Sequence, residues 1–191
     1  LPVLAKSAAS AAVVPADAEL PSESSGIQVD DVHAAFVKIV RHFRPPRKRC
    51  LQGVHPQAIV SASADIADDA VIHAGAFVDD DVVIGPGSVV HSGARVLAGC
   101  QIGRGVTLFP NCVLYEDTRV GDGSIVHAAA VIGAYGFGYT AEDGSHQPTA
   151  QLGWVEIGTN VEGGGSACLA RATYGPTRTA DGTQSQQRVQ M

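Results

Sequence analysis

The sequence predicts an all-β fold, a left-handed parallel β-helix of hexapeptide repeats, preceded by a small α/β remnant. An aliphatic residue returns at every sixth position from Ile66 to Ile132, twelve times in succession. A second column, four residues after the first, holds only small or β-branched residues from Ala70 to Ala130. A period of six fits neither an α-helix nor a single strand. It fits short strands and corners that each form one side of a triangular coil.

Both columns are expected to fill the interior of the coil. Three hexapeptides make one turn, so residues that are 18 apart stack at the strand spacing of ~4.8 Å. Gly85, Gly103 and Gly121 have this spacing and predict a glycine column at one corner, where glycine tolerates backbone angles closed to other residues. Cys100 and Cys112 fall in the small-residue column, which predicts buried, reduced thiols.

The repeat divides the chain into five parts. Its phase holds up to Gly133, breaks in a glycine-rich polar stretch, and returns with Ile157 and Val161. It then falters, because the expected aliphatic positions 163 and 175 are both glycine. The predicted parts are an α/β remnant (1–44), a linker (45–57), the β-helix (58–133), an ejected loop (134–153), and a degenerating coil with a polar tail (154–191).

The remnant is expected to contain one strand and one helix. The stretch AAVVPADAELP predicts a short strand followed by a turn. The stretch DDVHAAFVKIVRHF predicts an amphipathic helix. Asp30 or Asp31 can cap the helix, and Pro45 with Pro46 ends it. A basic cluster follows in the linker, from Arg44 to Arg49, and is interpreted as a solvated segment.

The composition limits the possible functions. A net charge of −6 argues against nucleic acid as the main partner. The chain has no run of about 18 apolar residues, so no membrane span is expected. The four cysteines lack metal-ligand spacing, which favours reduced thiols in a cytoplasmic protein and no metal site. The chain begins with Leu1, which suggests that a segment is missing upstream.

Histidines form one outer column of the predicted coil. His73 and His91 are 18 apart, and His127 lies two coils beyond His91 with Phe109 between them. A zinc site needs three ligands that converge on one ion, which these positions do not provide within one subunit. We interpret them as histidines on a coil face. A zinc enzyme similar to the β-helical carbonic anhydrases remains an alternative that metal analysis would test.

The ejected loop concentrates aromatic residues and glycines. A regular solenoid needs no such excursion, so a loop of this length is typical of a functional segment. Phe137 and Tyr139 are candidate residues for an apolar groove or a subunit interface, or they anchor the loop on the coil.

Several sequence segments resemble those of one acyltransferase family. Four segments resemble the UDP-3-O-acylglucosamine N-acyltransferases of lipid A biosynthesis: HPQAIVSASADIADDAVI, VIGAYGFGY, QLGWVEIG and RATYGPTR. The end of that family's uridine-binding domain and its linker resemble three further segments: AASAAVVPADAELP, IQVDDVHAAFVKIVRHFRPP and GVHP. The similarity runs from about residue 4 to residue 184, and the chain is identified as a member truncated at both ends.

The resemblance implies a homotrimer that works without a cofactor. It implies transfer of a 3-hydroxyacyl chain from an acyl carrier protein thioester to the 2-amino group of a UDP-linked, O-acylated glucosamine. A histidine acts as general base in such enzymes and an aspartate orients it. Phe137 and Tyr139 match the family loop and are expected to line the acyl or pantetheine groove, and Arg171 matches a retained position.

The resemblance implies no catalytic residue within this chain. The family pattern is roughly T-K-I-D-N-x-V-x-I-A-H-N, and the matching stretch is TQSQQRVQM. Gln186 stands at the aspartate position, and the histidine position lies beyond Met191. We therefore expect no measurable acyl transfer from the 191-residue chain alone. A non-catalytic trimeric β-helix scaffold is the corresponding alternative.

Overall fold

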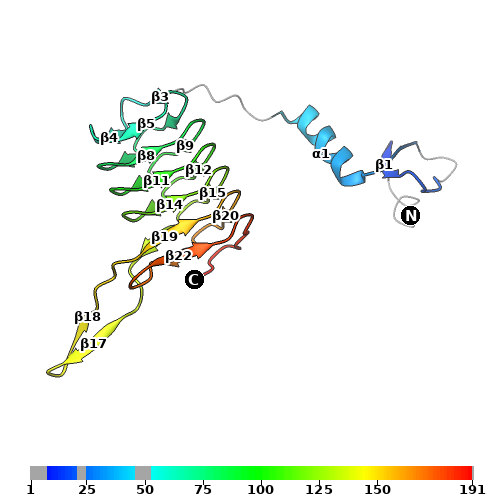
Figure 1. Cartoon of the computed structure of the whole chain (residues 1–191). Helices are drawn as coiled ribbons and strands as arrows, with labels where there is room; N and C mark the ends of the chain where they lie inside the picture. Colours follow the sequence, from blue (N-terminus) through cyan, green and yellow to red (C-terminus); the bar gives the residue numbers. More distant parts are fainter. Residues whose placement is uncertain (1–7, 21–24, 46–52, 191) are drawn as a thin grey trace. The chain divides into compact units, whose positions relative to one another are not determined.

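The computed structural model describes residues 8–20, 25–45 and 53–190. The chain forms two compact units, Leu1–Arg49 and Cys50–Met191 (Figure 1). Most of the predicted linker, with Cys50 and Arg47 to Arg49, lies outside the described residues. No helix of the described part has both the length and the apolar character needed to cross a membrane.

The first unit is a small α/β structure. Strands β1 (Ala12–Pro15) and β2 (Gly26–Val29) pair in parallel, and helix α1 (Val32–Phe43) follows them. The Asp31 carboxylate accepts a hydrogen bond from the backbone N–H of Ala34 at 2.9 Å, so it caps the helix. Strand β2 was not predicted, because four residues carry too little periodicity to reveal a strand.

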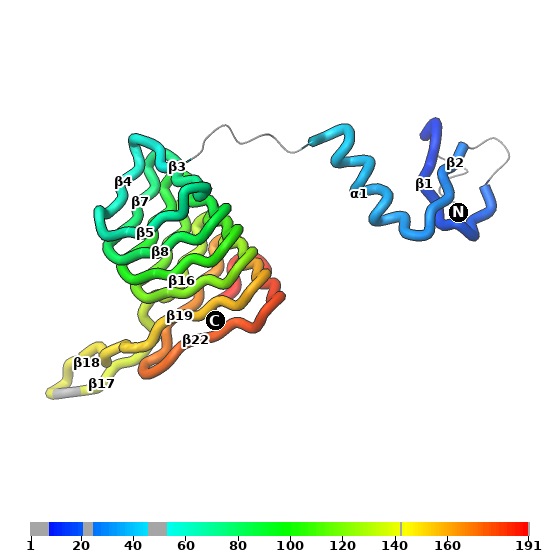
Figure 2. The backbone as a smooth tube through the Cα atoms, turned by 45° about the horizontal axis from the view of Figure 1, so that its top comes forward, coloured from blue at the N-terminus to red at the C-terminus, as the bar shows by residue number. Residues whose placement is uncertain are grey.

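The second unit is a parallel β-helix whose three walls are six-stranded sheets (Figures 1 and 2). The chain visits the three walls in turn, so each wall takes every third strand except across the hairpin strands β17 and β18. One wall consists of β3 (Gly53–Val54), β6 (Val71–Ile72), β9 (Val89–Val90), β12 (Thr107–Leu108), β15 (Ile125–Val126) and β20 (Glu162–Gly163). The second consists of β4 (Ile59–Val60), β7 (Phe77–Val78), β10 (Arg95–Val96), β13 (Val113–Leu114), β16 (Val131–Ala134) and β21 (Cys168–Ala170). The third consists of β5 (Asp65–Ile66), β8 (Val83–Ile84), β11 (Gln101–Ile102), β14 (Arg119–Val120), β19 (Trp154–Ile157) and β22 (Pro176–Thr179).

The interior of the β-helix matches the two predicted columns. Ile84 pairs with Ile66 on one side and with Ile102 on the other, so aliphatic side chains stack from coil to coil. Ile84 is 1% exposed, and Ala94 and Cys100 of the second column are fully buried. The predicted fold class, a parallel β-helix of hexapeptide repeats after a small α/β unit, is confirmed. Its first strand, β3, lies a few residues before the expected start at residue 58.

The predicted glycine column exists, but its cause is different. Gly85, Gly103 and Gly121 do not have positive φ angles. A Cβ atom on Gly85 would lie 2.6 Å from the carbonyl oxygen of Gly103, and one on Gly121 would lie 2.5 Å from that of Gly158. Glycine is therefore required here by the close approach of successive coils and not by the backbone angles of the corner.

The ejected loop contains a β-hairpin. Strands β17 (Tyr139–Glu142) and β18 (Ser145–Pro148) pair in an antiparallel manner and project from the coils (Figure 1). The coil resumes at once, because Val120 of β14 pairs with Ile157 of β19. The hairpin is thus inserted between two successive coils of an otherwise continuous stack.

The final coils differ from the expected register. Thr179, and not position 175, pairs with Ile157 and continues the interior column, because the chain makes an additional bend before β22. The last residues still follow the coil, since isolated bridges join Glu162 to Gln184 and Cys168 to Gln190. The polar tail is therefore a further, weakly paired coil.

The core thiols yield a testable prediction. Burial raises the pKa of both Cys100 and Cys112 to about 12. At pH 8 both are protonated in the folded protein, so iodoacetamide is expected to leave them unmodified. In urea both become accessible and are expected to react. Mass mapping of the alkylated peptides checks this, and rapid native labelling of either cysteine would contradict the burial.

Candidate active site at a histidine–glutamate pair

The histidine column is a ladder of stacked rings on the outside of the coils. The rings of His73 and His91 stack with centroids 4.8 Å apart, and Phe109 lies 5.2 Å from His91 and 5.0 Å from His127. The predicted order of the column is therefore confirmed. His127 is its last ring.

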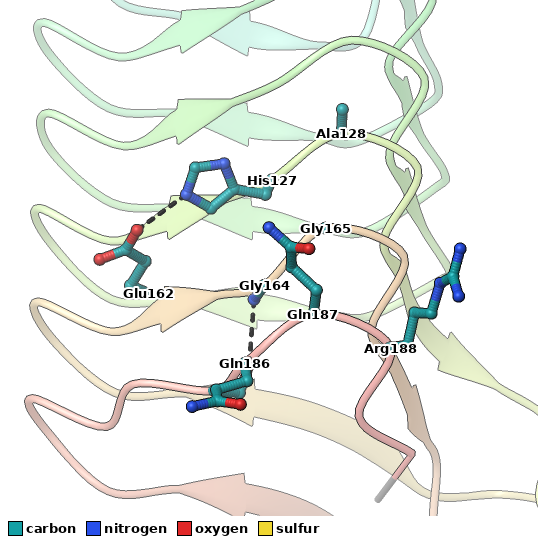
Figure 3. Close-up of a pocket in the computed structure, with 9 residues that line it drawn as sticks. His127, Ala128, Glu162, Gly164, Gly165, Gln186, Gln187 and Arg188 are labelled. Atoms are coloured by element: carbon teal, nitrogen blue, oxygen red, sulfur yellow. Dashed lines mark hydrogen bonds and ion pairs between the residues drawn. The ribbon is translucent and has the colours of Figure 1, made fainter.

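His127 forms an ion pair with a residue of the next coil. Its Nε2 atom lies 2.8 Å from Oε1 of Glu162, which stands on β20 beside β15 (Figure 3). The side chains are 37% and 47% exposed, so solvent and small molecules can reach the pair. A carboxylate at this distance accepts a hydrogen bond from the imidazole ring and holds its orientation.

The next position in the column carries no side chain. The N–H of His127 bonds the carbonyl of Gly163, which places Gly164 in line with the imidazole ring. Phe109 covers one face of that ring, and Gly164, the next position of the column, contributes no side chain to the other face. A Cβ atom on Gly164 would lie 2.3 Å from the carbonyl oxygen of Gln186, so the last coil requires glycine at this position.

A pocket of about 970 Å³ opens at this place (Figure 3). His127 and Glu162 lie on one side, and the last coil forms the other, with a hydrogen bond of 3.0 Å from the N–H of Gly164 to Oγ of Ser185. The volume is at the upper end of that of small-molecule pockets. The lining residues are His127, Ala128, Glu162, Gly164, Gly165, Ser185, Gln186, Gln187 and Arg188.

Gln186 is exposed and lines this same pocket. Its amide donates and accepts hydrogen bonds but does not ionise. The position where the resemblance implies an aspartate therefore lies close to the His127–Glu162 pair, which supplies a carboxylate from a different coil.

The two predicted groove residues lie elsewhere, on the hairpin. Phe137 and Tyr139 meet edge to face with centroids 5.2 Å apart, and together with His146 they line a smaller pocket. Phe137 is 97% exposed and Tyr139 is 53% exposed. Exposed aromatic rings of this kind can take an apolar ligand.

Arg171 fixes the root of the hairpin. Its side chain is 8% exposed, and its Nε donates to the carbonyl oxygen of Gly133 at 2.7 Å. Its Nη2 donates to the backbone oxygen and to Oε2 of Glu116, both at 3.1 Å. The guanidinium also lies 5.2 Å from the ring of Tyr135. Arg171 is thus a buried anchor at the point where the chain leaves the coil.

Metal ligands do not converge in the part of the chain that the structure describes. No group of three His, Cys, Asp or Glu side chains there could hold an ion. The ring of Phe109 stands between those of His91 and His127 in the column.

Comparison with known proteins identifies relatives of the second unit and of the sequence before it. The family model "Bacterial transferase hexapeptide (six repeats)" matches residues 99–134. The UDP-3-O-acylglucosamine N-acyltransferase of Pseudomonas putida strain F1 is 37% identical over 163 residues, which cover 85% of this chain and 46% of the relative. That of Anaeromyxobacter sp. strain Fw109-5 is 36% identical over 97% of this chain and 54% of its own. The chain is a homologue of these N-acyltransferases. It spans about half the length of the curated relatives it matches.

Two solved structures share the fold of this homologue. PerB from Caulobacter crescentus, in complex with CoA and GDP-perosamine, aligns with a TM-score of 0.55 and 21% identity, covering 80% of this chain and 62% of its own. The acetyltransferase domain of PglB from Neisseria gonorrhoeae, in complex with acetyl coenzyme A, aligns with a TM-score of 0.52 and 24% identity, covering 70% and 53%. At these identities the comparison establishes the fold alone.

The sequence did not reveal the partner of His127. Glu162 and His127 are 35 residues apart, and the hairpin separates them. The available signal was the alternation of side chains along a strand. Glu162 is next to the inward position 163 and so faces outward, as His127 does beside the inward Val126. Only the register across the hairpin shows that the two positions lie on neighbouring coils.

Proposed function

We propose that the protein takes part in N-acyl transfer in lipid A biosynthesis. The acceptor is the 2-amino group of a UDP-3-O-acylglucosamine, and the donor is a 3-hydroxyacyl thioester of acyl carrier protein. The observation that carries the proposal is the homology with N-acyltransferases of that name, at 36–37% identity over 85–97% of the chain. The β-helical fold is compatible with it, since the acetyltransferase domain of PglB shares that fold.

The hairpin provides the groove for the acyl donor. Phe137 and Tyr139 present adjoining ring surfaces beside His146, and both are accessible. Aromatic contacts of this type contribute about 0.5–1.5 kcal/mol each beyond the burial of their area. The groove therefore binds the apolar chain or the pantetheine arm of the thioester.

A binding measurement tests this function independently of turnover. Calorimetry with a 3-hydroxyacyl pantetheine thioester and with UDP-3-O-acylglucosamine is expected to show that the chain binds both. The double substitution Phe137→Ser and Tyr139→Ser should weaken thioester binding by about tenfold, since 1.4 kcal/mol corresponds to a factor of ten. Binding of the sugar nucleotide should remain unchanged.

The matched control is Tyr174→Ser. Tyr174 is also an exposed aromatic residue, at 87%, but it lies outside the hairpin pocket. This variant should bind the thioester like the parent chain. If the parent chain binds neither ligand, the proposed function is wrong. If the double variant binds the thioester as well as the control does, the groove lies elsewhere.

The assembly and location are part of the same proposal. We place the protein in the cytoplasm as a homotrimer of β-helices, because the family resemblance implies this arrangement for enzymes that use acyl carrier protein. Light scattering coupled to size exclusion should give three times the mass of the chain, and a monomer would overturn this part.

A trimeric binding scaffold without turnover is the second candidate function. Gln186 favours it, because an amide stands in the pocket where the family has a carboxylate. The scaffold would bind both substrates in the calorimetric experiment and would transfer no acyl group. Transfer by the purified chain would exclude it.

A further inference from the structure

We propose that His146 is a specificity-determining residue of this protein and that it recognises the 3-hydroxyl group of the acyl chain of the donor thioester. The inference rests on the proposed function and deepens it, because it assigns the hairpin groove to the acyl end of the thioester and not to its pantetheine arm. His146 lies on β18, opposite the strand that carries Tyr139, and lines the groove together with Phe137 and Tyr139.

The strand register places His146 on the same face of the hairpin as Tyr139. Side chains alternate between the two faces of a strand, so Tyr139 and Ala141 of β17 share one face. Ala141 pairs with His146, and Tyr139 pairs with Pro148. His146 and Tyr139 are therefore diagonal neighbours across the hairpin, and the small side chain of Ala141 leaves space beside the imidazole ring.

The backbone is fixed on both sides of Phe137. The carbonyl of Gly138 accepts a hydrogen bond of 2.9 Å from the N–H of Thr149. A Cβ atom on Gly136 would lie 3.0 Å from the carbonyl oxygen of Arg171, and one on Gly138 would collide with Oγ1 of Thr149. The two glycines let this segment lie close to its neighbours while Phe137 stays exposed. A backbone that is already ordered lowers the entropic cost of covering the ring with a ligand.

The lining of the groove matches an apolar chain that carries one hydroxyl group. Phe137 and Tyr139 offer ring surface to methylene groups, and the volume of about 330 Å³ is at the lower end for small-molecule sites. A neutral imidazole donates one hydrogen bond and accepts another, as a hydroxyl group does. None of the described residues forms a hydrogen bond or ion pair with the imidazole of His146, so its nitrogens can bond a ligand.

The groove fits the acyl end of the thioester better than the pantetheine arm. That arm carries two amide groups, which would lose water against the rings of Phe137 and Tyr139 without enough partners to replace it. A 3-hydroxyacyl chain has one polar substituent close to its thioester end, and the imidazole of His146 can bond it. The hydroxyl of Tyr139 is the other polar group of this lining, and a separate variant tests it.

The test is calorimetric binding to the purified 191-residue chain. The ligands are a 3-hydroxyacyl pantetheine thioester and the thioester of the same chain length without the hydroxyl group. The parent chain should bind the hydroxylated thioester about two- to tenfold more tightly, which is the range for one net hydrogen bond. His146→Phe should bind both thioesters equally, because its ring is apolar. His146→Gln should keep a preference, because an amide also donates and accepts.

Gln147→Leu is the matched control. Gln147 is also an exposed polar residue of β18, but it pairs with Thr140 on the opposite face and donates to Oγ of Ser145 at 3.3 Å. The preference should therefore remain that of the parent chain. Tyr139→Phe removes the other hydroxyl of the groove, and the ratio of the two affinities should not change. Circular dichroism of each variant checks that the β-helix is intact. A preference that persists in His146→Phe, or that Tyr139→Phe abolishes, would overturn the assignment.

The failure of this inference differs from the failure of the proposed function. Equal binding of the two thioesters by the parent chain would overturn the inference and leave N-acyl transfer as the proposed function. Binding of UDP-3-O-acylglucosamine without either thioester would overturn both the inference and the hairpin groove, while recognition of the acceptor would stand. Absence of binding for the sugar nucleotide and for both thioesters would overturn both proposals.

Discussion

Ile84→Ala is expected to lower the free energy of unfolding by about 2–5 kcal/mol. The side chain is 1% exposed and lies in the stack between Ile66 and Ile102. Truncation removes buried apolar area and leaves a cavity, because the coils above and below are held at a fixed spacing by their backbone hydrogen bonds. A urea titration followed by circular dichroism measures the loss.

Val83→Ala is the matched control for this substitution. Val83 precedes Ile84 in β8, but it faces outward and is 42% exposed. Its truncation should cost less than about 1 kcal/mol, since a surface substitution changes stability little. If the two variants unfold at the same urea concentration, the inward direction of the six-residue column is wrong.

Gly85→Ala is expected to destabilise the β-helix by about 1–3 kcal/mol or more, although alanine is the smallest possible addition. The new Cβ would lie 2.6 Å from the carbonyl oxygen and 2.7 Å from the carbonyl carbon of Gly103. Both are backbone atoms, so no side chain can move aside. Relief requires the two coils to separate, which weakens the hydrogen bond of 2.8 Å from the Gly85 N–H to Ile102.

Gly87→Ala isolates the effect of backbone angles from that of contact. Gly87 has a φ of +68°, and a Cβ atom there would have no neighbour within 4 Å. Its replacement should cost about 1–2 kcal/mol, the penalty of a left-handed conformation for an L-residue. Thermal unfolding of both variants compares the two causes. A Gly85→Ala variant as stable as the parent chain would contradict the close approach of the coils.

The sequence predicted the repetitive part of the fold well, because each coil repeats the same packing problem. Positions such as Ile84 and Cys100 recur in phase with their neighbours, so a single period places all of them. The column of rings from His73 to His127 was predicted from the same 18-residue spacing. A one-dimensional repeat converts spacing in the sequence directly into proximity in space.

Two of the features that the sequence did not predict lie where the period is interrupted. The pairing of Glu162 with His127 depends on how the chain re-enters the stack after the hairpin. The interior position of Thr179 depends on a bend before β22 that the repeat does not encode. The cause of the glycine column was also missed, because the distance between two coils is a property of the stack and not of one turn.

The hairpin insertion has a consequence for how such a protein can change. The hairpin follows β16, yet β14 and β19 of the two flanking coils pair as if no residue had been added. Deleting, extending or exchanging the hairpin would therefore leave the strand register of the three sheets unchanged. The hairpin can thus change during evolution, and with it what it recognises, while the β-helix is inherited unchanged. Specificity and stability can then evolve separately.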